Sequence, residues 1–208
     1  MITVLFGPPG SGKGTQAAVI SERFHLPHIS TGQMLRDEVE GGTELGREVA
    51  PIMTSGGLIP DETMVKVIEH RLAQPDAEPG VLLDGFPRTV PQAQELDAML
   101  ERTGREIGVV LFFDVPESEL SKRIAHRAEV DHRADDTPEA FVQRMREYEA
   151  KTQPVVGYYE GRGTRIEYVN GNAPIEAVTD SILTIFGGQV TDPHGKGSTP
   201  PLPAHEVA

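Results

Sequence analysis

The chain has 208 residues and a formal net charge of −13, because 32 Asp and Glu residues outnumber 19 Lys and Arg residues. A surface this acidic repels polyphosphate backbones and anionic lipids, so we expect neither nucleic acid nor a membrane as a partner. The sequence has no cysteine, which excludes disulfides and thiolate metal sites. The first apolar run is too short for a signal peptide, and no run approaches the ~18 apolar residues of a membrane helix. We therefore expect a cytoplasmic protein.

Short apolar runs alternate with helical patterns along most of the chain. Apolar runs predict strands at 2–6, 27–30, 81–84, 109–113 and 165–169. Helical spacing predicts helices at 15–24, from a cap at Thr31, across 41–72 with breaks near Gly56 and Pro60, and at 91–100, 117–127, 141–159 and 174–186. This alternation predicts an α/β fold in which a parallel sheet is flanked by helices on both faces.

Composition divides the chain into two parts. Residues 1–188 carry the alternating pattern and are predicted to form one domain. Residues 189–208 are rich in Pro, Gly, Ser and Thr. Such a segment has too little apolar surface to fold, so it is predicted to be a disordered tail.

A glycine-rich loop follows the first strand and opens the first helix, which is the position of a phosphate-binding P-loop. It reads Gly7-Pro8-Pro9-Gly10-Ser11-Gly12-Lys13-Gly14-Thr15. Backbone N–H groups from Gly10 to Thr15, the helix N-terminus and the Lys13 ammonium are expected to hold the phosphates of ATP. The general pattern has Ser or Thr directly after the lysine, whereas here Gly14 precedes Thr15, so a magnesium-binding hydroxyl is expected to be shifted or absent. The alternative is a glycine-rich turn without a ligand.

A second polar group ends the strand at 81–84. Asp84 is followed by Gly85, Phe86, Pro87 and Arg88. A carboxylate at a strand end beside a P-loop is expected to hold Mg²⁺, and Asp84 is predicted to do so through water, because Mg²⁺ keeps much of its hydration shell. Gly85 permits close backbone approach, and Arg88 offers a two-pronged donor to a phosphate. The alternative is a strand-to-turn junction with a surface arginine.

Several segments taken in order resemble the adenylate kinase family. They are Gly12-Lys13-Gly14-Thr15-Gln16, residues 29–36, residues 83–89, Asp135-Asp136-Thr137-Pro138, and Tyr158-Tyr159. The resemblance covers about residues 1 to 187, and the family's own P-loop also carries Gly-Thr after the lysine. It implies a P-loop kinase with an AMP-binding helical segment at 30–59 and a short lid at 126–136. One departure is Gln33, where the family usually has Asp.

The resemblance implies an AMP site. Its residues would be Thr31, Arg36, Gly57, Leu58, Ile59, Gly85, Phe86, Pro87, Arg88 and Gln92, with Arg133 and Arg144 reaching the phosphates. An amide can donate and accept at once, which matches the adenine edge and makes Gln92 the main argument for AMP.

The resemblance also implies an ATP side and a lid. Arg127 and the backbone near Asn172 would contact ATP, and Arg123 would lie on the same side. The catalytic set would be Lys13, Asp84, Arg88, Arg123, Arg133 and Arg144. Asp135 and Asp136 are predicted to orient these arginines. A lid this short and without cysteine is expected to hold no zinc, and no strong general base is required.

The expected activity is reversible transfer of the ATP γ-phosphoryl group to AMP, giving two ADP, with Mg²⁺. Such an enzyme would balance adenine nucleotides and serve purine nucleotide salvage, here as a monomer. One alternative is a kinase for UMP, CMP or GMP. Another is a P-loop protein that binds ATP for regulation, which would leave the acceptor arginines without a purpose. A purely structural domain does not explain Lys13 and Asp84 at adjacent strand ends.

Overall fold

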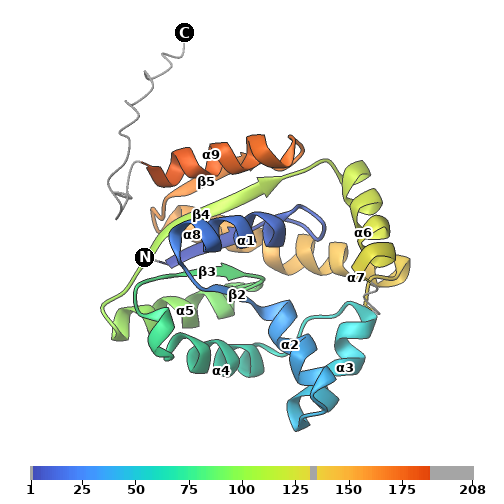
Figure 1. Cartoon of the computed structure of the whole chain (residues 1–208). Coiled ribbons are helices and arrows are strands. Elements are labelled where there is room, and N and C mark those ends of the chain that lie inside the picture. The colour runs from blue at the N-terminus through green and yellow to red at the C-terminus, as the bar shows by residue number, and fades with distance from the viewer. Residues whose placement is uncertain (1, 132–134, 188–208) are drawn as a thin grey trace.

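Five short strands form one parallel sheet in the order β2-β3-β1-β4-β5 (Figure 1). The computed structural model describes residues 2–131 and 135–187. The strands are β1 (Ile2–Phe6), β2 (His28–Ser30), β3 (Val81–Asp84), β4 (Ile107–Asp114) and β5 (Ile166–Asn170). Each neighbouring pair runs parallel. β1 is apolar along nearly its whole length because both of its faces are buried. The predicted fold class is confirmed.

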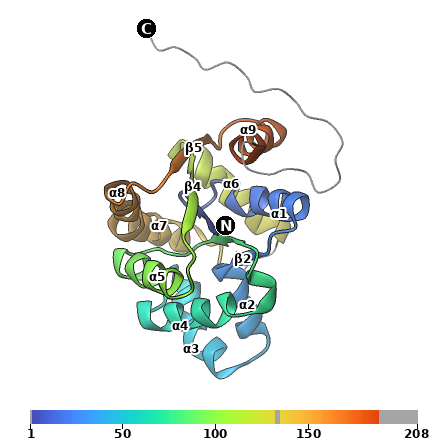
Figure 2. The same ribbon diagram turned by 90° about the vertical axis from the view of Figure 1, so that its left-hand side faces the viewer.

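Helices cover both faces of the sheet (Figure 2). On one face lie α1 (Lys13–Phe24) and α9 (Ile175–Gly187). On the other lie α4 (Asp61–Leu72), α5 (Val90–Arg102) and α8 (Gln153–Gly161). Side chains along a strand alternate between faces, so Leu5 belongs to the apolar cluster of Ile20 and Phe186, whereas Val4 belongs to that of Leu96 and Tyr159. The core is thus two apolar layers separated by the sheet.

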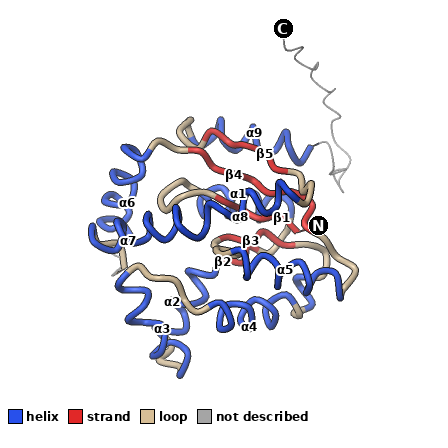
Figure 3. Tube along the Cα trace, turned by 180° about the vertical axis from the view of Figure 1, so that it is seen from behind, coloured by secondary structure: helices blue, strands red, loops and turns tan. Residues whose placement is uncertain are grey.

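Two helix pairs extend past the strand ends, and they lie together at one end of the molecule (Figure 3). One pair is α2 (Thr31–Glu40) and α3 (Glu44–Ser55); the other is α6 (Glu117–Asp131) and α7 (Pro138–Glu147). The pairs meet where α3 ends. Gly56 has φ +76°, and a Cβ there would lie 2.5 Å from the carbonyl oxygen of Ala140 in α7. Only glycine allows this close approach without a shift of the backbone.

The helix predicted over 141–159 is present but is not uniform. A π-helical segment, η2 (Tyr148–Thr152), joins α7 to α8. Pro154 sits in the first turn of α8. Because proline has no N–H and its ring crowds the preceding turn, a regular α-helical ladder cannot run through it. A short 3₁₀ turn, η1 (Pro75–Ala77), precedes β3.

Several sequence-based boundaries were wrong; for example, β4 begins at Ile107 rather than 109, and α7 begins at Pro138 rather than 141. Helix α1 begins at Lys13 rather than Thr15, and α6 continues to Asp131. Ser30, not Thr31, caps α2, since its Oγ accepts the N–H of Gln33 at 3.4 Å. Thr31 is the first residue of the helix, and its hydroxyl instead donates to the Gly85 carbonyl oxygen at 3.0 Å. The tail predicted at 189–208 lies outside the described residues. Of the helices in residues 2–131 and 135–187, none is long and apolar enough to cross a membrane.

Candidate active site

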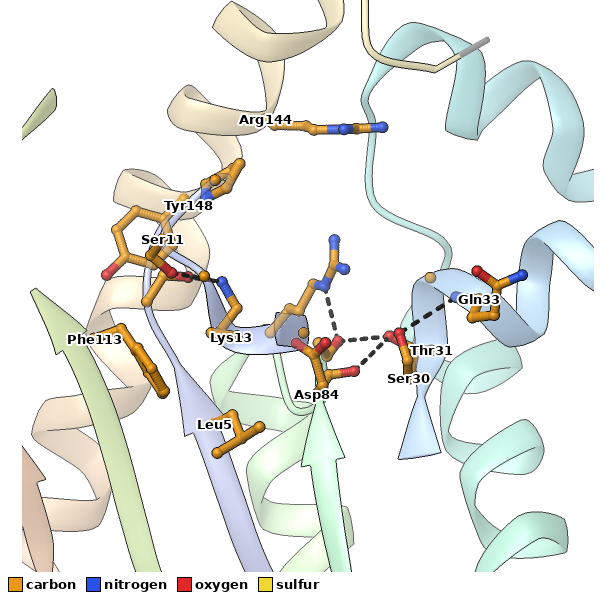
Figure 4. A pocket seen from close by; sticks show the side chains of 18 of the residues that line it. Leu5, Ser11, Lys13, Ser30, Thr31, Gln33, Asp84, Phe113, Arg144 and Tyr148 are labelled. Atoms are coloured by element: carbon orange, nitrogen blue, oxygen red, sulfur yellow. Dashed lines mark hydrogen bonds between the residues drawn. The ribbon is translucent and has the colours of Figure 1, made fainter. Parts of the chain in front are cut away.

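A large cavity of about 1050 Å³ opens at the carboxyl ends of β1, β2 and β3. This edge is where ligands bind in open parallel sheets. The P-loop, the ends of β2 and β3, and both projecting helix pairs contribute to its lining. Figure 4 shows Lys13, Asp84 and Thr31 along one wall, with Arg144 reaching across from α7. Single ligand pockets usually measure ~300–1000 Å³, so the volume suits one long ligand or two adjacent ones.

The P-loop curls around the ammonium of Lys13. Its Nζ donates to the carbonyl oxygens of Gly7 at 2.7 Å and Pro8 at 2.9 Å, and to Ser11 Oγ at 3.1 Å. Three glycines make the curl possible, since Gly7, Gly10 and Gly12 have φ of +146°, +83° and +92°. Gly12 is the N-cap of α1, and the first turn of that helix lines the cavity, where its N–H groups have no acceptor within the helix. Gly14 and Thr15 line the same wall.

Burial changes the acid–base behaviour of Lys13. It lowers the pKa of the ammonium to about 8, an effect that Asp84 opposes and that Arg88 and Arg127 reinforce. The cost of the buried charge is largest when no anion is near. An anionic phosphate would stabilise the protonated form, so this lysine is suited to bind one.

Asp84 faces Lys13 from the neighbouring strand, and it is ionised. Burial alone would raise the pKa of this carboxyl, but His28, Lys13 and Arg88 outweigh that effect and hold the pKa below its usual range. Nε2 of His28 lies 3.4 Å from Asp84 Oδ2, although the contact lacks hydrogen-bond geometry. Oδ2 is also 3.6 Å from where a Cβ on Gly14 would be. The carboxylate therefore sits directly against the P-loop.

The segment after β3 is tightly held. Gly85 has φ +83°, and a Cβ there would lie 2.6 Å from Thr31 Oγ1. Arg88 Nε donates to the Gly85 carbonyl oxygen at 2.8 Å, and Thr152 Oγ1 donates to the Arg88 carbonyl oxygen at 2.9 Å. These bonds hold the guanidinium of Arg88 at the cavity wall, beside Gly85.

The residues predicted for the acceptor nucleotide gather around this segment. The cavity lining includes Thr31, Arg36, Gly57, Leu58, Ile59, Gly85, Pro87, Arg88 and Gln92. The side chain of Phe86 is instead part of the apolar core beneath them. Gln33, the family departure, accepts from Arg36 at 2.9 Å and donates to Asp37 at 2.7 Å, so its amide links a cation to an anion.

Carboxylates hold the arginines of α6 and α7. Arg127 makes two bonds to Asp136, at 2.6 and 2.7 Å, and Arg144 donates to Asp136 at 2.8 Å and also to Asp135. Burial alone would raise the pKa of Asp136, but the two arginines hold it below its usual range. Nη1 of Arg36 lies 4.0 Å from Asp135, so this carboxylate also faces the acceptor wall. The predicted role of Asp135 and Asp136 in orienting arginines agrees with these contacts.

Arg123 points to the loop after β5. Its Nη1 donates to the Gly171 carbonyl oxygen at 2.9 Å, and its Nη2 lies 3.5 Å from Asn172 Oδ1. Gly171 and Ala173 line the cavity on either side of Asn172. A Cβ on Gly171 would lie 3.0 Å from the Ser11 carbonyl oxygen, so this loop packs against the P-loop. Arg133 lies outside the described residues.

Two polar residues at the site were not predicted from the sequence. His28 contacts Asp84, and Asp61 bonds to Gln92 Nε2 at 2.8 Å. Neither residue belongs to a motif, and each contacts a side chain on a different helix or strand. The only signal for His28 was its place in a predicted strand; for Asp61, it was a carboxylate at a helix start.

Among the described residues, no group of three or more His, Cys, Asp or Glu side chains is arranged to hold a metal ion. A single ionised carboxylate beside a phosphate loop nevertheless fits Mg²⁺, which commonly takes one or two carboxylates, water and substrate phosphates.

Comparison with known proteins agrees with this geometry. The family model for adenylate kinase matches residues 5–164. The chain is 46% identical over 183 residues to the adenylate kinase of Stenotrophomonas maltophilia, covering 88% of this chain and 97% of that protein. It is 45% identical over 184 residues to that of Thermobifida fusca, covering 88% and 97%. It is 41% identical over 212 aligned residues to that of Methanothrix thermoacetophila, covering 89% and 98%. Together with the P-loop, the strand-end carboxylate and the arginines around one cavity, these matches show that the chain belongs to the adenylate kinase family.

Proposed function

We propose that this protein transfers the γ-phosphoryl group of ATP to AMP, reversibly, giving two ADP. Its role would be to balance adenine nucleotides and to serve purine nucleotide salvage. One observation carries the proposal: a single cavity is lined by Lys13 of the P-loop and by three arginines outside it, Arg36, Arg88 and Arg144. A protein that binds only ATP needs the first cation but not the others.

Positioning and charge stabilisation carry most of the reaction, because phosphoryl transfer asks for little covalent chemistry from the protein. Lys13 and the P-loop N–H groups, from Gly10 to Thr15, would hold the ATP phosphates. Arg88, on the segment after β3, would hold the AMP phosphate. Arg123, Arg127 and Arg144 would exchange their present acceptors for phosphate oxygens, and Arg133 is assigned to the same group from the sequence. Arg144 reaches across from α7, so it is suited to neutralise charge on the group in transit.

Asp84 would hold Mg²⁺ through water, in keeping with its ionised state beside the P-loop. When bound, the ion neutralises phosphate charge. Segments 30–59 and 126–136 would close over AMP and ATP and exclude water, which would otherwise accept the phosphoryl group. Asn172 would contact the ATP adenine through its backbone. A monomer fits a site that is completed within one chain, and the cytoplasm remains the location expected from the sequence.

The alternative acceptors are UMP, CMP and GMP. Gln92 and Thr31 favour AMP, because an amide can both accept from and donate to the adenine edge. The test is initial phosphoryl transfer from Mg·ATP to AMP, CMP, UMP and GMP in parallel. Preference for AMP in the wild type, with transfer abolished by Arg88→Ala, supports both activity and acceptor site. Preference for another acceptor would overturn the assignment of Gln92, and no transfer to any acceptor would overturn the proposed function.

A further inference from the structure

The amide of Gln92 is held at both ends. Its Oε1 accepts the backbone N–H of Arg88 at 2.7 Å, and its Nε2 donates to Asp61 Oδ1 at 2.8 Å. The residue is only 2% exposed, yet it lines the cavity. Within the described residues these are the hydrogen bonds that this amide group makes. Each bond uses one of two positions at that end, which leaves one N–H and one oxygen lone pair for a ligand.

The two partners permit only one orientation of this amide. A backbone N–H can only donate, and an ionised carboxylate can only accept. Rotation of the amide by 180° would place its NH₂ against the N–H of Arg88 and its oxygen against the carboxylate of Asp61. Both new contacts are repulsive, so the network itself decides which end is oxygen.

Asp61 is in turn held in place. It is the first residue of α4, and its Oδ2 accepts from Thr89 Oγ1 at 3.0 Å. The same Thr89 hydroxyl accepts the N–H of Gln92 at 3.2 Å as the cap of α5. One oxygen of Asp61 is thereby occupied, and the other is aimed at Gln92. Among the described residues, Gln92 lines the cavity and Asp61 does not. Asp61 therefore acts on the cavity only through Gln92.

We propose that Asp61 is a positioning residue for base selection: it locks the Gln92 amide in the orientation that accepts a 6-aminopurine and rejects a 6-oxopurine. This inference rests on the proposed function, in which Gln92 faces the acceptor base. Adenine offers a donor at N6 and an acceptor at N1, matching the oxygen and N–H that remain on Gln92. Hypoxanthine offers an acceptor at O6 and a donor at N1, which would match only the rotated amide.

The alternative is that Asp61 has only a structural role. A carboxylate in the first turn of a helix stabilises it, and the Thr89 bond ties α4 to α5. In that case the Asp61 variants would lose folding stability, and kcat/KM would change equally for every acceptor. The two readings therefore differ in the ratio of kcat/KM for AMP to kcat/KM for IMP, since the two nucleotides differ only at the edge in question.

The experiment measures this ratio in the full chain for the wild type, Asp61→Asn, Asp61→Ser and Gln92→Ala. Asparagine keeps the shape of Asp61 but can present either an oxygen or an NH₂, and serine keeps a residue suited to a helix start if asparagine does not fold. We expect each Asp61 variant to lower the AMP:IMP ratio by roughly ten-fold, the value of one directed hydrogen bond. The N–H of Arg88 retains part of the preference.

Glu62→Gln is the matched control. Glu62 lies in the same first turn of α4 and pairs with Lys66, with its side chain 82% exposed. The Glu62→Gln substitution removes the same charge as Asp61→Asn but leaves the contacts of Gln92 in place, so the AMP:IMP ratio should not change. In the Gln92→Ala background, Asp61→Asn should have no further effect on the ratio.

The outcomes separate the two proposals. An unchanged ratio in folded Asp61 variants, together with a lost preference in Gln92→Ala, would overturn this inference and leave the proposed function standing. A preference that survives Gln92→Ala would overturn both this inference and the assignment of the base site. Absence of any transfer to AMP in the wild type would overturn the proposed function itself.

Discussion

The two walls of the cavity hold their cations in different ways. On the P-loop wall, backbone carbonyl oxygens and one serine hydroxyl surround Lys13. On the wall formed by α6 and α7, carboxylates of Asp135 and Asp136 hold Arg127 and Arg144. A backbone receptor is fixed by turn geometry, whereas an ion pair is fixed by side chains that can exchange partners. The receptor for Lys13 is thus already formed in the free protein, whereas the arginines on the other wall would have to change partners to bind the proposed nucleotide.

The largest expected effect comes from the P-loop wall. Lys13→Ala should lower kcat/KM for ATP by about 10³-fold, because a point charge aimed at the phosphates is removed from a site of low dielectric. Burial disfavours this charge in the free protein, so we expect the fold to be kept. Steady-state kinetics with thermal unfolding checks this, and exposed Lys66→Ala is the control. A loss below ten-fold would contradict the view that this receptor is already formed.

A smaller loss is expected from the wall formed by α6 and α7. Asp136→Ala should lower kcat by about 10²-fold, because Arg127 and Arg144 lose their common anchor and misplaced catalytic groups cost about that much. KM for ATP should change less. The exposed Glu139 at the start of α7 provides the control variant Glu139→Gln. An unchanged kcat would show that the ligand alone orders these arginines.

The contact between the helix pairs can be tested through stability. Gly56→Ala should lower the free energy of unfolding by about 2–3 kcal/mol, from strain at positive φ and from collision with the carbonyl of Ala140. Gly42→Ala shares the positive φ, but no atom lies within 4 Å of its Cβ, so it should lose only about 1 kcal/mol. Urea unfolding measures both. Equal losses would mean that the collision is relieved by a movement of α7.

The smallest effect is a pH dependence on the P-loop wall. The pKa of Lys13 is lowered to about 8, so the free protein loses this cation as pH rises through that value. Affinity for ATP should be flat below pH 7 and fall up to about ten-fold by pH 9, measured by calorimetry. Between pH 8 and the ordinary lysine pKa the unfolded chain binds more protons, so this group's contribution to stability rises with pH. Unfolding caused by this group therefore cannot account for a fall in ATP affinity at high pH. Adenosine, which has no phosphate, should show no such fall.

The parts of the fold and site that could be predicted from sequence are those whose residues are close together in the chain. The P-loop and Asp84 were found because turn glycines, a lysine and a strand end are contiguous in the chain. The cap of α2 was misplaced by one residue because Ser30 and Thr31 carry the same functional group. His28 and Asp61 escaped because their contacts depend on which strands and helices become neighbours, and no spacing along the chain encodes the order β2-β3-β1. The amide of Gln92 was recognised, but not the partners that orient it.

The carboxylates that hold the arginines have a further consequence for an acidic protein. Asp135 and Asp136 are counterions built into the chain, so the cations beside them need not attract small anions from solution. On the proposed function, the phosphates of a bound nucleotide would replace these carboxylates rather than dissolved ions. Ion release, which makes the binding of polyphosphates sensitive to salt, should then be weaker than the number of arginines suggests. The cavity would also resist occupation by inorganic phosphate, which cannot bridge both walls at once.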